Sequence, residues 1–371
     1  MLALACCAVF LSWVAGFYHP RFGFSAFLLL TRDGEEYQLP VLRTIPHYRY
    51  PANHGYDGGM YVQLAMVPLL RDPAIDRALD APAYRARRIL FCWTAYGLGL
   101  GRPAWIMQAY ALQNVICWLL LAWLVTRWVP LDTPQTFALW VGSMFSHGLI
   151  TSVRLAVLDG PSLLLLACAI AAAERGRTWV TAGILGAAGL GRETNLLGAT
   201  ALPWPRGWRG WARVAGAGLI VILPLLVWQD YIWSIYRGTS LTEGAGQITV
   251  PFSAYVMKWR RTLEDPAGVG WIATIQQVLV IVALTVQAIY IAWARDWSAP
   301  WWRLAAAFAL LLATVHWVVW EGHPGAVTRV ALPLKFGFNA LLARDRPRAF
   351  WTWLVLGNLD LSMSGRLLPF T

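Results

Sequence analysis

Long apolar runs, interrupted by short polar segments, extend along almost the whole chain. A hydrocarbon core about 30 Å thick needs about 20 mostly apolar residues per helical span, so these runs predict membrane-spanning helices rather than one soluble core. The expected spans are 2–17, 89–101, 104–126, 135–153, 155–173, 178–203, 214–235, 271–294, 301–320, 326–343 and 350–365. The pattern predicts an all-α polytopic membrane protein, a single transmembrane domain over residues 1–371 with about 9 to 11 transmembrane helices.

Two hydrophilic segments, 18–88 and 236–270, interrupt this pattern. If the N-terminus is cytoplasmic, both segments fall on the outer face, as a first and a second extracytoplasmic loop. In the first loop, Asp72 and Pro73 are typical of a helix N-cap and first turn, and another short helix is expected from Pro82. Short amphipathic helices of this kind lie in the membrane interface.

Composition and charge placement agree with a membrane protein. Of 371 residues, 58% are hydrophobic and 13% are charged, whereas soluble domains carry about 25% charged residues. The net charge of +11 could indicate nucleic acid, but the arginines gather between apolar runs, at 206–213, 295–303 and 344–348. Such clusters are typical of cytoplasmic loops, so we expect membrane lipids and no nucleic acid as partners. The segment 174–177 also carries two arginines, yet it falls on the outer side in this count.

Cysteine and histidine offer no metal-binding pattern. The five cysteines lie in apolar stretches without CxxC or Cys/His spacing, which favours buried small side chains. His47, His54 and Asp57 are close in sequence, but their spacing matches no zinc site. We expect no metal site and no certain cofactor, with a divalent ion held partly by Asp57 as an alternative.

The most informative polar stretch runs from Asn53 to Gln63 and contains Asp57 between Tyr56 and two glycines. Asp57 precedes a predicted helix over 60–66, and an aspartate in this place is most often an N-cap. The glycines also leave the carboxylate open to a close approach by substrate, as a general base requires. Spacing alone favours the cap.

Three ionisable residues stand inside apolar runs: Asp159, Arg192 and Glu193. A charge at mid-bilayer costs roughly 3 kcal/mol or more, so such residues are expected to face the interior of the bundle and to pair. Asp159 precedes Gly-Pro and is either a helix cap or part of a site. Arg192 and Glu193 are either a structural ion pair that joins helices or part of a site.

A second group, Glu321, His323 and Arg329, surrounds a Gly-His-Pro-Gly turn at the outer end of a predicted helix. A guanidinium near the outer surface suits a lipid phosphate. Snorkelling of Arg329 to the headgroups explains its position equally well.

Several stretches resemble one family of bacterial membrane proteins linked to cell-surface glycopolymer formation. They are Gly-Tyr-Asp-Gly at 55–58 with Tyr61, Pro68–Pro73, Asp80–Leu90, Arg192–Thr194, Glu321–Gly322, Arg329–Pro333 and Phe338–Asn339. That family is similar to the GT-C glycosyltransferases, multi-spanning enzymes that use polyprenyl-phosphate sugars and carry a catalytic acid in the first outer loop. Asp57 occupies that position.

The resemblance implies a GT-C-like fold and a membrane glycosyltransferase in the bacterial plasma membrane, with its active site on the extracytoplasmic side. A polyprenyl-phosphate-linked sugar is the implied donor, and a cell-surface glycan or lipid-linked molecule is the implied acceptor. Asp57 would be the general base of an inverting transfer, and an arginine would stabilise the departing phosphate. The candidates for donor-phosphate or substrate binding are Arg329, Arg85, Arg87, Arg88, Tyr56, Tyr61, His54, Arg192, Glu193, Glu321, His323 and Asp159.

The chain also departs from the family pattern. Gly59 and Met60 stand where a glutamine and an aromatic residue commonly follow Asp-Gly, and Val67 stands where relatives often carry an acid. These departures put the strength of the activity in doubt. The alternatives are a non-catalytic transporter or flippase for lipid-linked glycans, for which buried charges are equally suitable, and a scaffold, which would need Asp57 only as a cap.

Overall fold

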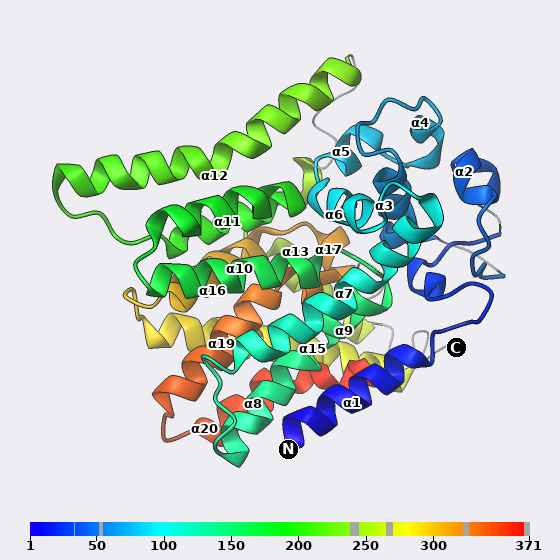
Figure 1. Cartoon of the computed structure of the whole chain (residues 1–371). Helices are drawn as coiled ribbons and strands as arrows, with labels where there is room; N and C mark the ends of the chain where they lie inside the picture. Colours follow the sequence, from blue (N-terminus) through cyan, green and yellow to red (C-terminus); the bar gives the residue numbers. More distant parts are fainter. Residues whose placement is uncertain (33, 52–54, 238–244, 265–269, 322–325, 367–371) are drawn as a thin grey trace.

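The computed structural model describes residues 1–32, 34–51, 55–237, 245–264, 270–321 and 326–366, and these residues fold into helices without a strand (Figure 1). Three helices are long and apolar enough to cross a bilayer: α7 (Pro103–Val125), α12 (Gly207–Ile235) and α15 (Trp271–Ala294). Three shorter apolar helices accompany them: α1 (Leu2–Ala15), α11 (Thr178–Gly191) and α16 (Pro300–Thr314). The expectation of an all-α membrane protein is confirmed at this level.

The other helices are short. The first polar segment contains α2 (Pro40–Arg43), α3 (Asp57–Met66), α4 (Ile75–Ala78) and α5 (Pro82–Ala86), with 3₁₀ turns η1 (Ser25–Leu28) and η2 (Glu35–Tyr37). The central part contains α6 (Leu90–Leu98), α8 (Pro134–Met144), α9 (His147–Arg154), α10 (Asp159–Glu174) and η3 (Glu193–Ala201). The remainder comprises η4 (Ala245–Gln247), α13 (Ser253–Glu264), α17 (Trp317–Glu321), α18 (Ala326–Val330), α19 (Leu332–Asp345), α20 (Phe350–Gly357) and η5 (Leu359–Arg366).

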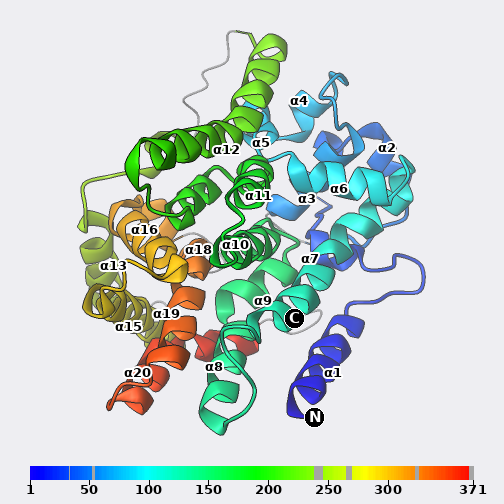
Figure 2. The ribbon, with the colours of Figure 1, turned by 60° about the vertical axis from the view of Figure 1, so that its left-hand side comes forward.

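The longer helices run between two ends of the bundle (Figures 1 and 2). At the first, the site end, α5 packs against α12, and Gly58 of α3 lies against Leu155 in the turn before α10. Trp228 of α12 donates to the carbonyl of Ala86 at 2.8 Å, and Tyr231 donates to that of Leu69. These bonds attach the first polar segment to the bundle.

At the second, the arginine end, loops from distant parts of the chain meet through ion pairs. Arg127 binds Glu174 at 3.0 Å, and Arg344 binds Asp296 at 2.7 Å. The segments 174–177, 201–213, 295–303 and 344–348 therefore share this end, and they contain the arginine clusters of the sequence.

Two predicted spans differ from the expected single helices. Together they explain why segment 174–177 was expected on the opposite side from the other arginine clusters. Run 89–101 forms only α6, and a helix of 9 residues is about 14 Å long, too short to cross a bilayer. Run 178–203 forms α11, which reaches the site end at Gly191, and then η3, which returns to the arginine end. Because 89–101 does not cross the bundle, segment 174–177 lies at the same end as the other arginine clusters. Because η3 returns from the site end, segment 204–213 lies at the arginine end as well.

The predicted span 135–153 is also divided, into α8 and α9, because the helix breaks at Phe145 and Ser146. Within the first polar segment, the short helix expected from Pro82 is present as α5. The helix expected after Pro73 is shorter than predicted: Asp72 accepts from the backbone N–H of Ala74, and α4 begins at Ile75.

Candidate functional site

A cavity of about 680 Å³ opens at the site end between α3, α5 and the segments that begin at Val157, Arg192 and Val315. Its remaining walls are mostly apolar, with Leu311 and Val319 among them. Five arginines and four carboxylates line it, which leaves an excess of one positive charge: Arg85, Arg87, Arg88, Arg192, Arg329, Asp57, Asp80, Asp159 and Glu193. A space that combines apolar walls with surplus positive charge suits an anionic amphiphile.

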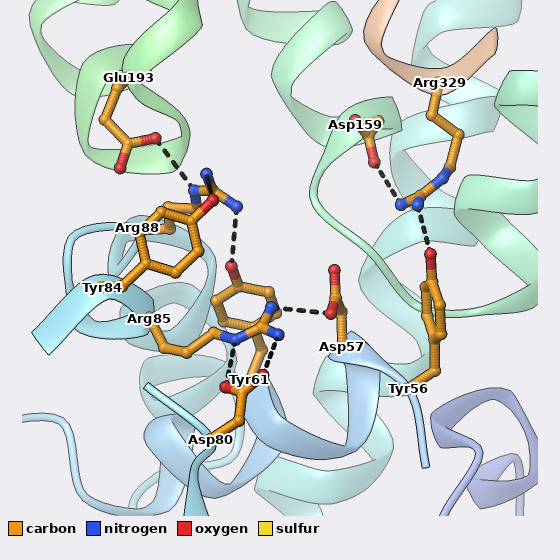
Figure 3. Close-up of polar contacts among 10 residues, drawn as sticks. All are labelled: Tyr56, Asp57, Tyr61, Asp80, Tyr84, Arg85, Arg88, Asp159, Glu193 and Arg329. Atoms are coloured by element: carbon orange, nitrogen blue, oxygen red, sulfur yellow. Dashed lines mark hydrogen bonds and ion pairs between the residues drawn. The ribbon is translucent and has the colours of Figure 1, made fainter. Parts of the chain in front are cut away.

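Asp57, the first residue of α3, is held by Arg85. Nη1 of Arg85 lies 2.7 Å from Oδ1 of Asp57, while its Nε and Nη2 bind the two oxygens of Asp80 at 2.9 and 2.8 Å (Figure 3). Among the described residues, the second oxygen of Asp57 accepts no hydrogen bond. The Asp57 side chain is 28% exposed, so this oxygen is available to a molecule in the cavity.

The pairing of Arg85 with Asp80 also fixes their charges. The hydrogen bonds from Arg85 lower the pKa of Asp80 below its usual value, although partial burial opposes the change. Burial works to lower the pKa of Arg85, but the bonds and charges of its partners raise it overall. Arg85 therefore stays a cation beside Asp57 at any physiological pH.

A second arginine of the first polar segment, Arg88, lies two residues after α5 and connects this segment to η3. Its Nε binds Glu193 at 3.0 Å, and its terminal nitrogens donate to the hydroxyls of Tyr84 and Tyr61 at 2.6 and 3.3 Å. The Tyr61 ring also lies under the guanidinium of Arg85, 5.6 Å from its centre. These contacts fix the spacing between the two arginines.

The third part of the site is a buried ion-pair network. Asp159 lies between two arginines: Arg329 binds one oxygen at 3.0 Å, and Arg192 binds the other. Arg329 also donates to the hydroxyl of Tyr56 at 2.5 Å (Figure 3). The Nε atoms of Arg192 and Arg329 and one oxygen of Glu193 are buried without a hydrogen-bond partner in the described part of the chain. Most buried polar atoms in native structures have hydrogen-bond partners, so these atoms mark the network as a candidate binding site.

Local structure explains how Asp159 reaches this position. Ser152 donates to the carbonyl of Val157 at 2.9 Å and accepts from the N–H of Gly160 at 2.8 Å, which closes the turn before α10. Ala156, in this turn, has a left-handed φ of 46°. The turn aims Asp159 into the bundle, where its side chain is only 4% exposed.

Gly58 permits the close approach of α3 to the same turn. A Cβ atom at Gly58 would lie 2.3 Å from the carbonyl oxygen of Leu155, a distance that requires one segment to move. Gly59 is similarly close to the carbonyl of Leu28, at 3.1 Å. The two glycines thus bring Asp57 and Asp159 to one cavity.

Four sequence interpretations are wrong. Asp159 is not the N-cap of α10, because Leu158 holds that place and Asp159 binds two arginines. Asp57 is not the N-cap of α3, because Tyr56 holds that place without a side-chain cap bond and Asp57 binds Arg85 instead. Arg329 does not snorkel to the headgroups, since it is buried and bound to Asp159. Arg192 and Glu193 do not join helices as a pair, because each binds a different partner.

Glu321 does not line the cavity. It binds Lys258 of α13 at 3.0 Å instead. His54 and His323 lie outside the described residues. Arg87 does line the cavity, with its guanidinium 5.8 Å from the centre of the Tyr84 ring.

Asp80 and Tyr84 are site residues to which the sequence assigned no role. Asp80 lies just before α5 and Arg85 lies near its end, so a carboxylate and a guanidinium five positions apart, on either side of a helix start, were the available signal. Val67, the residue directly after α3, does not line the cavity. In the described residues, no three His, Cys, Asp or Glu side chains gather as a metal site.

No family of known proteins, no curated protein sequence and no solved structure matches this chain.

Proposed function

We propose that this protein is a membrane glycosyltransferase that moves a sugar from a polyprenyl-phosphate donor to a cell-surface glycan or lipid-linked acceptor. The observation that carries the proposal is the position of Asp57. Its partly exposed carboxylate shares an amphiphilic, net positive cavity with Arg192 and Arg329.

Asp57 is suited to act as the general base. Arg85 holds one carboxylate oxygen, and the other faces the cavity and would accept the proton of an acceptor hydroxyl. The acceptor oxygen then forms a bond to the anomeric carbon as the bond from that carbon to the phosphate oxygen breaks. An inverting outcome rests on the resemblance to GT-C enzymes.

Arg192 and Arg329 are suited to stabilise the leaving group. The polyprenyl phosphate departs with the electron pair of the broken bond, and its charge develops close to fixed donors. Because the leaving group is already an anionic phosphate, one carboxylate base suffices. Glycoside hydrolysis, in contrast, needs a second carboxyl group to protonate the leaving oxygen.

Charge placement supports an extracytoplasmic site in a bacterial plasma membrane. The arginine clusters lie at the end of the bundle opposite the cavity, and arginine-rich loops mark the cytoplasmic side. Apolar side chains such as Leu166 and Leu185 pack around Gly198 between the two ends. A packed apolar region there favours an enzyme over a transporter or flippase.

The deciding experiment compares Asp57→Asn with Asp72→Asn, an exposed acid of the same loop, in cells that lack the native gene. Asn preserves the size of Asp57 but cannot accept the proton. We expect loss of the glycan product only in Asp57→Asn, at equal protein levels in the membrane. Purified protein should convert a lipid-linked donor covalently. Transfer from a soluble nucleotide sugar but not from the lipid donor, or movement of the donor without conversion, would overturn the proposal.

A further inference from the structure

A second cavity, of about 780 Å³, lies at the arginine end, on the opposite side of the bundle from the candidate site. Four arginines line it, Arg206, Arg209 and Arg213 around the start of α12 and Arg303 from α16. The only carboxylate in its lining is Glu174, which is already bound by Arg127 at 3.0 Å and by the indole of Trp128 at 2.7 Å. The cavity therefore has a strong excess of positive charge.

The arginines of α12 are exposed and have no ion-pair partner among the described residues. Arg303 donates to the carbonyl of Ala201 at 2.9 Å, while its Nε is buried without a partner. Three exposed arginines without an ion-pair partner, together with a fourth arginine in the lining of the same cavity, suit an anionic ligand.

The surroundings indicate where such an anion would come from. Arg206 and Arg213 are one heptad apart, and the same heptad continues along α12 as Ile220 and Val227. These two apolar side chains are 39% and 61% exposed. One face of α12 thus passes from arginines at the cavity to exposed apolar surface beyond it, which matches a molecule with an anionic head and hydrocarbon tails.

Exposed indoles lie in the segments that form this cavity, as is typical of a membrane–water interface, and two of the four, Trp204 and Trp297, line it. The four are Trp204, Trp208, Trp211 and Trp297.

We propose that this cavity binds the headgroup phosphate of an anionic phospholipid, whose acyl chains lie along the exposed apolar face of α12. The guanidinium groups of Arg206, Arg209, Arg213 and Arg303 bind the phosphate oxygens. The site is separate from the sugar-transfer cavity and does not depend on the function proposed for it.

The test uses the full-length protein, equilibrated with vesicles of equal parts phosphatidylglycerol and phosphatidylcholine, repurified, and analysed for retained lipid. The cavity variant is R206Q/R209Q/R213Q. The control R175Q/R177Q/R348Q removes as many exposed positive charges from the same end of the bundle without breaking an ion pair of the described residues, and R206K/R209K/R213K keeps the charge in the cavity. Because the three arginines of α12 are exposed and unpaired, the cavity variant should remain folded.

We expect several-fold enrichment of phosphatidylglycerol on the wild type, the control and the lysine variant, and none on the cavity variant. Equal loss in the control would mean general attraction to a basic surface and would overturn the proposal, as would full enrichment in the cavity variant. Displacement of the lipid by millimolar inorganic phosphate or glycerol phosphate would assign the cavity to a soluble ligand instead.

Discussion

The guanidinium of Arg85 lies 2.7 Å from the carboxylate of Asp57 and binds both oxygens of Asp80 with its remaining nitrogens. One cation therefore fixes the orientation of the proposed base while it is itself fixed by a second acid. This arrangement leaves the free oxygen of Asp57 facing the cavity, and it makes Arg85 a positioning residue that need not touch the substrate.

Replacement of Arg85 by lysine should lower kcat and leave the KM of the donor little changed. Lysine keeps the charge but cannot bind both acids at once, and a misplacement of about 1 Å costs about 100-fold in rate. Asp80→Asn, which still accepts hydrogen bonds, should cause a smaller loss. Steady-state kinetics of the purified variants with a lipid-linked donor measure both effects, and wild-type turnover in Arg85→Lys would contradict the positioning role.

Replacement of Arg329 by lysine should lower kcat about 100- to 1,000-fold, as the loss of one preorganised donor to a developing anion does. Arg154→Lys is the matched control, because Arg154 is also buried but lies outside the cavity, where it contacts the Phe17 ring and the Tyr50 hydroxyl. That control should lower the unfolding temperature and keep kcat. If both variants lose the same activity, Arg329 has only a structural role.

The all-α architecture and the first polar segment could be predicted from sequence, because both depend on local composition. The role of Asp57 as a base stays a prediction that rests on the family resemblance. The path of 89–101 could not be predicted from hydrophobicity. The run is apolar, but Gly97, Gly99 and Gly101 surround the end of α6, and a side chain at Gly99 would collide with Ile106 of the returning helix α7.

The ion-pair network around Asp159 could not be predicted from sequence patterns either. Asp159 and Arg329 are 170 positions apart, and their pairing depends on how α10 and α18 pack. Arg192 and Glu193 are neighbours in sequence, so they suggested a pair. At the end of α11 the chain turns sharply, and their side chains diverge towards Asp159 and Arg88.

Gly58→Ala should destabilise the protein by about 1 to 3 kcal/mol, the usual cost of forcing extra volume into a packed region. The new Cβ would lie 2.3 Å from the carbonyl oxygen of Leu155, so α3 must move away from the turn before Asp159. Gly183→Ala is the control, since a Cβ at Gly183 in α11 meets nothing within 4 Å. Thermal unfolding in detergent should show a lower midpoint only for Gly58→Ala, and equal midpoints would mean that α3 is not packed as described.

The first polar segment should lose stability as the pH falls below about 6.5, the ordinary pKa of histidine, because of His47. This side chain is buried, with Nδ1 2.8 Å from the carbonyl of Ile45 and Nε2 facing the Nε of Arg49 at 3.4 Å. Burial lowers the pKa of His47 and the charge of Arg49 adds to this, although the Ile45 bond and Glu35 oppose it.

The difference in proton binding between the folded and unfolded segment decides the direction of the pH effect on stability. Between the two pKa values the unfolded segment takes up a proton that the folded segment does not, so stability is complete above the unfolded pKa and falls as the pH decreases through the folded one. Hydrogen exchange of residues 25–50, corrected for intrinsic rates, should therefore show weaker protection at pH 5 than at pH 7. His47→Gln, which does not titrate, should remove that difference; the same pH dependence in His47→Gln would assign the effect to another group.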